Sequence, residues 1–156
     1  MKKVFLLVLV LSSLLWSETF NVPKDELCLI RKIKVYENPM WIASIKVRSG
    51  KVIYFSSPKA MFEFYYRPGK WPEYNVKSDN DMRIHVTDYN SLEKIPARDA
   101  FFVYGSTKVS PGGDDLVPFK TKEAAQKFYD ENSGKRIFSF EETSAALINY
   151  LNGRYK

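Results

Sequence analysis

Two segments of the chain share one apolar pattern at helical spacing, and this repeat constrains the fold more than any other feature. Ser57 and Thr121 stand at equivalent positions in the two segments. Both are good N-cap residues, because a hydroxyl can accept a hydrogen bond from a free N–H of the first helical turn. Apolar residues then return with a period near 3.6, at Ala60, Met61, Phe64 and Tyr65 and again at Ala124, Ala125, Phe128 and Tyr129. The pattern predicts two amphipathic helices.

Each predicted helix follows a short apolar run that ends in Phe, over 52–55 in the first case and 116–119 in the second. Alternating or apolar runs predict further strands at 41–47, 82–89, 97–104 and 137–140. We therefore expect an α+β fold of two tandem related ββαβ units, 18–90 and 91–156, with an added C-terminal helix over 142–151. Units of this size bury little of their own surface, so they should pack together. The alternative is two unrelated helices with a common pattern.

Local signals predict several further features. Partial alternation over 29–36 favours a half-exposed strand. Residues 91–95 are expected to form a short turn or a helical piece. Gly134 is expected to take the left-handed conformation just after the second helix. The aromatic residues around the loop at 67–72 favour a segment folded over the first helix, with a flat binding surface as the alternative; they are Tyr65, Tyr66, Trp71 and Tyr74.

The N-terminus has the features of a targeting segment. Lys2 and Lys3 precede an apolar run over 4–15, and Ser17 is a small residue suited to a cleavage site. We predict a signal peptide over 1–17, export and a periplasmic location, with an uncleaved membrane anchor as the alternative. No cysteine directly follows the apolar run, which does not support a lipoprotein signal. Export makes nucleic acid an unexpected partner, and the mildly basic remainder indicates solubility rather than a specific ligand.

Cys28 is the only cysteine, so it cannot form an internal disulfide. Thiolates and methionine thioethers are the soft ligands that Cu(I) prefers, and Met40, Met61 and Met82 are the methionines outside the N-terminal segment. The alternative is a buried, inert cysteine with methionines in a core.

Other candidate residues give weaker signals. His85, the only histidine, alternates with Ile84 and Val86, which favours a half-buried strand residue over a ligand or a base paired with Cys28. The sequence Gly112-Gly113 is interpreted as a plain turn rather than an anion-binding nest. The acidic pairs Asp114-Asp115 and Glu141-Glu142 are interpreted as solvated ends of elements.

Several motifs along the chain resemble the nitrous oxide reductase accessory protein family, NosL. The most specific block runs from Pro118-Phe119-Lys120-Thr121 to Phe140-Glu141-Glu142. The others are Cys28 with Pro39-x-Trp41, Tyr54-Phe55 followed by Met61, Val86-Thr87-Asp88-Tyr89, and the run from Ala100 to Gly105. The resemblance implies two related strand-strand-helix-strand units, in agreement with the repeat.

The chain departs from this family mainly at sulfur. Similar family members carry Cys-x-x-Cys-Gly-Met, whereas here Cys28 is followed by Arg31, Lys32 and Ile33 at the later positions. A later Met-Gly of the family corresponds to Gly112-Gly113. The chain thus resembles a divergent member that lacks most of the usual Cys/Met motif.

The resemblance implies an exported accessory protein, not an enzyme, that binds or delivers copper(I) for the assembly of nitrous oxide reductase. Cys28 and Met61 are the metal-site residues that it implies, and no catalytic residue is expected. The expected partners are nitrous oxide reductase or its assembly proteins, and a membrane only if the N-terminal signal is uncleaved. The alternative is a metal-free module that acts as a protein-binding or assembly scaffold.

Overall fold

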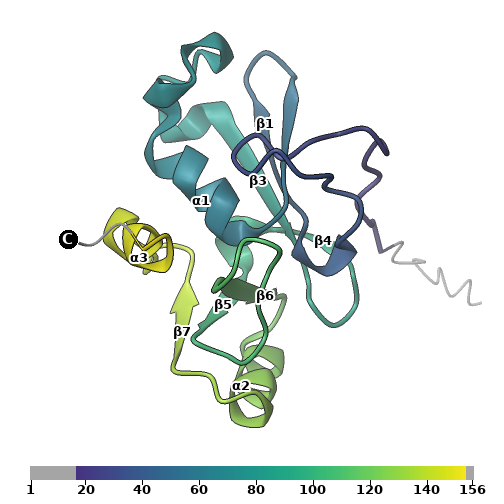
Figure 1. Ribbon diagram of the computed structural model, residues 1–156, viewed down its shortest axis with the longest axis vertical. Coiled ribbons are helices and arrows are strands. Elements are labelled where there is room, and N and C mark those ends of the chain that lie inside the picture. The colour runs from purple at the N-terminus through teal and green to yellow at the C-terminus, as the bar shows by residue number, and fades with distance from the viewer. Residues whose placement is uncertain (1–16, 154–156) are drawn as a thin grey trace, which may run out of the picture.

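The computed structural model describes residues 17–153, which form two antiparallel sheets and three α-helices (Figure 1). The first sheet has the order β2-β1-β3-β4, and its strands are Val52–Phe55, Ala43–Val47, Met82–Thr87 and Lys94–Pro96. The second has the order β6-β5-β7, with strands Leu116–Phe119, Phe101–Tyr104 and Arg136–Ser139. The helices are α1 (Pro58–Tyr66), α2 (Lys122–Glu131) and α3 (Ala145–Leu151).

The predicted repeat is confirmed. In both units a hairpin is followed by a helix and a third strand that pairs with the first strand, so the orders β2-β1-β3 and β6-β5-β7 match. The helix caps match as well, because Ser57 Oγ accepts from Ala60 N and Thr121 Oγ1 accepts from Ala124 N, both at 3.2 Å. The expected α+β class with two ββαβ units and a C-terminal helix is therefore correct. Strand β4 pairs with β3 and adds a fourth strand to the first sheet.

The two units share their cores, as their size required. The larger cluster of buried side chains takes α1 and the first sheet together with Phe102, Phe138 and Ile148 from the second half of the chain. The smaller cluster, under α2, includes Trp41 from the first half. Backbone contacts continue this junction, because Tyr89 N donates to Pro118 O at 2.9 Å.

Helix α3 is placed by the first unit rather than by its own. Figure 1 shows α3 beside α1, on the far side of α1 from the first sheet. Ser144 Oγ caps α3 by accepting from Leu147 N at 3.1 Å, and Tyr66 and Thr143 share a hydrogen bond of 2.7 Å between their hydroxyl groups.

The segment 29–36 is not the expected strand. Only the isolated bridge between Leu27 and Lys34 pairs there, and Lys32 has a left-handed φ of +57°. The expected strand at 97–104 is also shorter, because a 3-10 turn over Ala97–Asp99 precedes β5. The expected turn or helical piece at 91–95 is in part a strand, since β4 begins at Lys94.

The residue in the left-handed conformation after α2 differs from the predicted one. Ser133, with φ +58°, takes the left-handed conformation, and Gly134 does not. A β-carbon at Gly134 would lie 2.6 Å from Tyr129 Cδ2, so this glycine is needed for close packing against the helix.

Five short 3-10 turns complete the described part of the fold; they are Pro39–Trp41, Pro68–Lys70, Pro72–Tyr74, Asp79–Asp81 and Ala97–Asp99. The aromatic loop folds over α1 as predicted, because the Phe64 ring lies 5.4 Å from Trp71 and 5.6 Å from Tyr74, centroid to centroid. The predicted signal peptide over 1–17 lies almost wholly outside the described residues. Within 17–153, no helix is both long and apolar enough to cross a bilayer.

Candidate functional site around Cys28

Cys28 begins a tight loop at the outer edge of β2. Its backbone N–H donates to Ile33 O at 2.8 Å, and its carbonyl accepts from Lys32 N at 2.9 Å. Leu29 N donates to Tyr54 O at 3.3 Å, which fixes the loop to the free edge of β2. These bonds close the loop over 28–33, and the left-handed Lys32 makes the reversal possible.

The thiol of Cys28 is enclosed. The residue is 0% exposed, and Arg31 N lies 3.4 Å from its Sγ in a geometry that suits an N–H donating to sulfur. This contact sets the direction of the sulfur within the loop. A ligand reaches the thiol only if the loop or its surroundings open.

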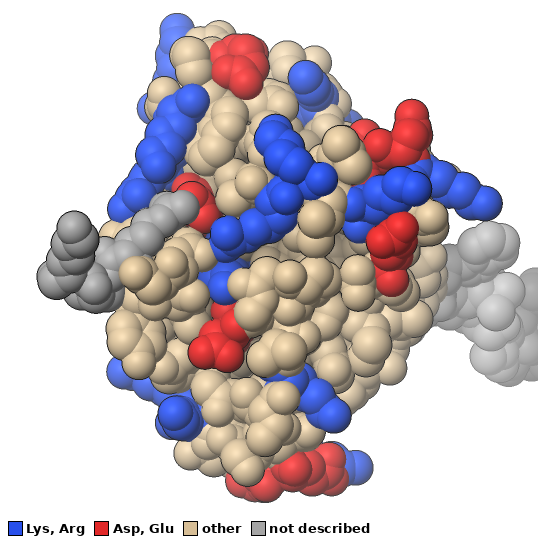
Figure 2. Space-filling view, in the orientation of Figure 1, with Lys and Arg blue, Asp and Glu red and all other residues tan. Residues whose placement is uncertain are grey.

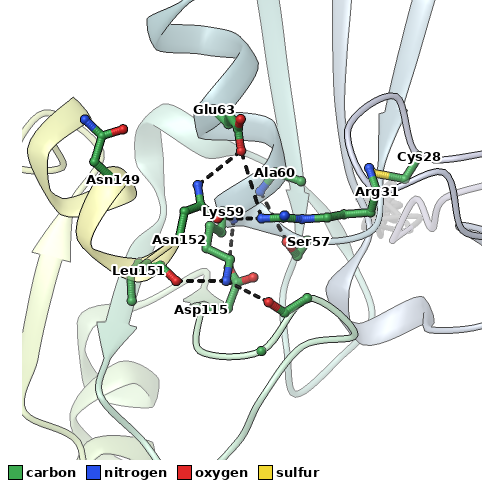
Figure 3. A network of polar contacts seen from close by, with 12 residues as sticks. Cys28, Arg31, Ser57, Lys59, Ala60, Glu63, Asp115, Asn149, Leu151 and Asn152 are labelled. Atoms are coloured by element: carbon green, nitrogen blue, oxygen red, sulfur yellow. Dashed lines mark hydrogen bonds and ion pairs between the residues drawn. The ribbon is translucent and has the colours of Figure 1, made fainter. Parts of the chain in front are cut away.

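The Arg31 side chain runs away from the sulfur, toward α1 and α3 (Figure 3). Its Nη2 donates to Asn152 Oδ1 at 2.5 Å and lies 3.9 Å from Glu63 Oε2. Asn152 Nδ2 also donates to Glu63 Oε2, at 3.1 Å. The guanidinium is therefore balanced by a buried carboxylate and an amide, which weakens its repulsion of any cation at Cys28.

Gly112 leaves room for Arg31. A β-carbon at Gly112 would lie 3.3 Å from Arg31 Nε, so a larger residue would press on the guanidinium. The turn at 110–113 is the plain turn that was expected, with Ser110 and Gly113 exchanging backbone hydrogen bonds. The Gly112 carbonyl faces a cation, Lys59, rather than an anion.

A buried lysine and a buried aspartate lie next to this group. Lys59 Nζ donates to Gly112 O at 2.8 Å and to Leu151 O at 3.4 Å. Asp115 accepts from Lys59 N at 2.7 Å, from Ser110 Oγ at 2.7 Å and from Leu116 N at 2.9 Å. Burial lowers the pKa of Lys59 and raises the pKa of Asp115, because each charged form loses its hydration. Asp115 is thus not the solvated residue that was expected.

Lys59 and Glu63 were not predicted as site residues from the sequence, although a signal was present. They are the only charged residues of α1, and they stand four positions apart in an otherwise apolar helix. That spacing puts both on one face. Asn152 gave no such signal, because an Asn near the end of a helix is ordinary.

Met61 is fully buried, like Cys28, and belongs to the same large core cluster. It stands two residues from both Lys59 and Glu63, which puts it about 200° around α1 from Lys59, on the face opposite the polar contacts of Arg31. The assignment of Cys28 and Met61 as metal ligands stays a prediction. Among residues 17–153, no group of three or more His, Cys, Asp or Glu side chains has the geometry of a metal site.

His85 does not belong to this site. It lies on β3, opposite Ser44 on β1, whereas Cys28 lies beyond β2 on the other side of β1. Two strand spacings, about 9–10 Å, therefore separate His85 from β2, which rules out a Cys28–His85 nucleophilic pair. Burial lowers the pKa of His85, and the nearby Lys94 charge lowers it further. His85 is a half-buried strand residue, as expected.

Charge over the face that carries α1 and α3 is mixed. Figure 2 shows Lys and Arg side chains spread across this face, with Asp and Glu side chains between them. The candidate site is thus a buried polar group beside a thiol, and it does not lie within a surface field of one sign.

The NosL family model matches residues 19–148. Among solved structures, the chain is similar to the crystal structure of the copper chaperone NosL from Shewanella denitrificans, with a TM-score of 0.69 and 22% sequence identity. The match covers 83% of this chain and 98% of that one. No curated protein matches.

Proposed function

Because the chain belongs to the NosL family, we propose that it is an exported accessory protein that binds copper(I) through Cys28 and delivers it for the assembly of nitrous oxide reductase. Family and fold are those of a chaperone-type accessory protein rather than an enzyme. Copper(I) is here the cargo, and the proposed partners are nitrous oxide reductase or its assembly proteins.

The observation that carries the copper role is the arrangement at Cys28. The sole thiol of the chain lies in a closed loop, and the guanidinium of Arg31, three residues after Cys28, is held away from the sulfur by Glu63 and Asn152. A thiolate is a soft donor suited to Cu(I). The proposed second donor is the thioether of Met61. With so few soft donors, the chain is suited to passing the ion on rather than to storing it.

A metal-free scaffold is the second candidate. Complete burial of Cys28 and the presence of Arg31 in the same loop favour it, because a nearby cation opposes the entry of a metal ion. In this case the fold alone would serve assembly, by binding a partner protein.

Gene replacement in the organism that encodes the chain separates the two candidates. We expect deletion to lower the copper content and activity of nitrous oxide reductase, and the parent gene to restore both. A Cys28→Ser gene should fail to restore them if copper passes through the thiol. If Cys28→Ser restores the reductase fully, the scaffold is the correct function. If deletion has no effect on the reductase, the accessory role itself is contradicted.

Location is tested in the same strains. Fractionation should place the protein in the periplasm, either free or in the membrane fraction. Recovery of the full-length chain in the cytoplasm alone would contradict export.

A further inference from the structure

The outer face of the first sheet carries two cations that the fold does not explain. Lys46 on β1 and Arg83 on β3 are directly opposite each other in the register, and both are exposed. Like charges at such positions destabilise a sheet. Cations are often placed on edge strands to prevent edge pairing, but β1 and β3 are the two central strands.

Neither cation is neutralised by the rest of the described chain. No ion pair or side-chain hydrogen bond involves Lys46 or Arg83 within residues 17–153. Asp81, two residues before Arg83 in the sequence, already accepts from Lys77 N at 3.0 Å and from Ser78 N at 3.1 Å. These backbone hydrogen bonds lower the pKa of Asp81 and commit it to the local turn.

Lys46 and Arg83 line a recess of about 670 Å³, which we call the basic recess. Arg48 contributes a third cation, whose side chain is 87% exposed. It lies 3.6 Å from Asp81, which also lines the recess and partly offsets this third charge, so within the described chain Lys46 and Arg83 remain the unpaired cations. Ser78 and Asn80 add neutral polar groups to the wall. Arginine forks match carboxylate oxygens in a bidentate geometry, and a lysine beside them adds a mobile point charge.

We propose that the basic recess binds an acidic segment of a partner protein, with carboxylates facing Lys46 and Arg83. The concave shape favours a protruding segment of protein over a flat bilayer surface, because lipid headgroups in a plane do not fill a recess. The two opposed cations then have a role, since a bound carboxylate offsets their mutual repulsion. This interaction is independent of Cys28.

The test measures binding of a fluorescein-labelled hexaglutamate peptide by anisotropy, at low ionic strength. We expect saturable binding that weakens as salt is added. The double variant Lys46→Glu/Arg83→Glu should bind at least tenfold more weakly. The control is Lys122→Glu/Lys127→Glu, which changes the net charge equally on the exposed side of α2. Equal losses in both variants would show a non-specific charge effect and overturn the proposal.

A single variant separates binding from folding. Lys46→Glu places a carboxylate opposite Arg83, so the thermal midpoint should stay the same or rise while peptide binding falls. A lower midpoint together with weaker binding would indicate a structural role only, and would overturn the proposal. Finally, co-sedimentation with phosphatidylglycerol vesicles measures whether the protein binds a membrane. If the vesicles bind through Lys46 and Arg83 and the peptide does not, the site recognises a membrane and the proposal is wrong.

Discussion

At the residue scale, Arg31 shows why a site cannot be judged from one substitution in a motif. Arg31 follows Cys28 by only three residues, yet its guanidinium extends to Glu63 and Asn152, and its backbone N–H is the group that meets the sulfur. The direction of a long side chain depends on partners far away in sequence. The burial of Asp115 was missed for the same reason, because Lys59 N, which donates to its carboxylate, lies 56 residues away in the sequence.

His85 offers a clean residue-scale measurement, because it is the only histidine. Its pKa should lie below the ordinary histidine value, since burial and the charge of Lys94 both disfavour the imidazolium. As the pH falls below that ordinary value, the unfolded chain takes up the proton first, so the folded state loses stability over this window.

Proton NMR titration of the imidazole C–H signal checks the value. Lys94→Gln should raise the pKa of His85, because it removes the cation and also frees Glu18, whose charge raises this pKa. Lys127→Gln, on α2, should leave it unchanged. A titration midpoint at or above the ordinary histidine value would contradict the described burial.

At the element scale, the sequence predicted regular elements well and the loops poorly. The helices α1 and α2 begin at Ser57 and Thr121 as expected, because capping and apolar spacing are local signals. The predicted strand over 29–36 is wrong, because the backbone hydrogen bonds of this segment are made within its own loop and to the edge of β2. Alternation of apolar and polar residues cannot reveal such a pattern. The role of α3 could not be predicted from the sequence either. Its polar contacts with Arg31, Lys59 and Arg67 join residues that are far apart in the chain.

The end of α3 should therefore control access to the thiol. Asn152→Ala removes the partner of Arg31 and loosens the loop that encloses Cys28, so alkylation of Cys28 by iodoacetamide should become several-fold faster. Asn149→Ala is the matched control, because it removes only the 2.7 Å bond to Arg67 Nη2. Mass spectrometry of timed samples gives both rates. Equal rates in the parent and in Asn152→Ala would show that α3 does not guard the cysteine.

At the scale of the whole molecule, the family motifs mark the junction between the two units. Trp41 lies in the core under α2, and Asp88 Oδ1 accepts from Lys120 N at 2.8 Å. The sequence could predict the fold and family because this junction is retained. It could not settle the ligand set, because the soft donors expected at the Cys28 loop and at Gly112 are absent.

Trp41→Ala tests whether the junction holds the molecule together. It removes a large side chain that packs edge-on against Tyr89, with ring centroids 5.6 Å apart, and should cost about 3–5 kcal/mol of unfolding free energy. Urea unfolding followed by circular dichroism should remain a single transition. Trp71→Ala, in the partly buried loop over α1, should cost less. Two separate transitions, or a smaller loss for Trp41 than for Trp71, would mean that the units are not one cooperative body.

Anaerobic titration with Cu(I), in competition with a chromogenic chelator, tests the copper role most directly. We predict that the purified protein binds one equivalent of Cu(I), that Cys28→Ser abolishes this binding, and that Met61→Leu weakens it to a smaller extent. Binding at micromolar affinity or weaker that Cys28→Ser leaves unchanged would contradict a copper site at this thiol.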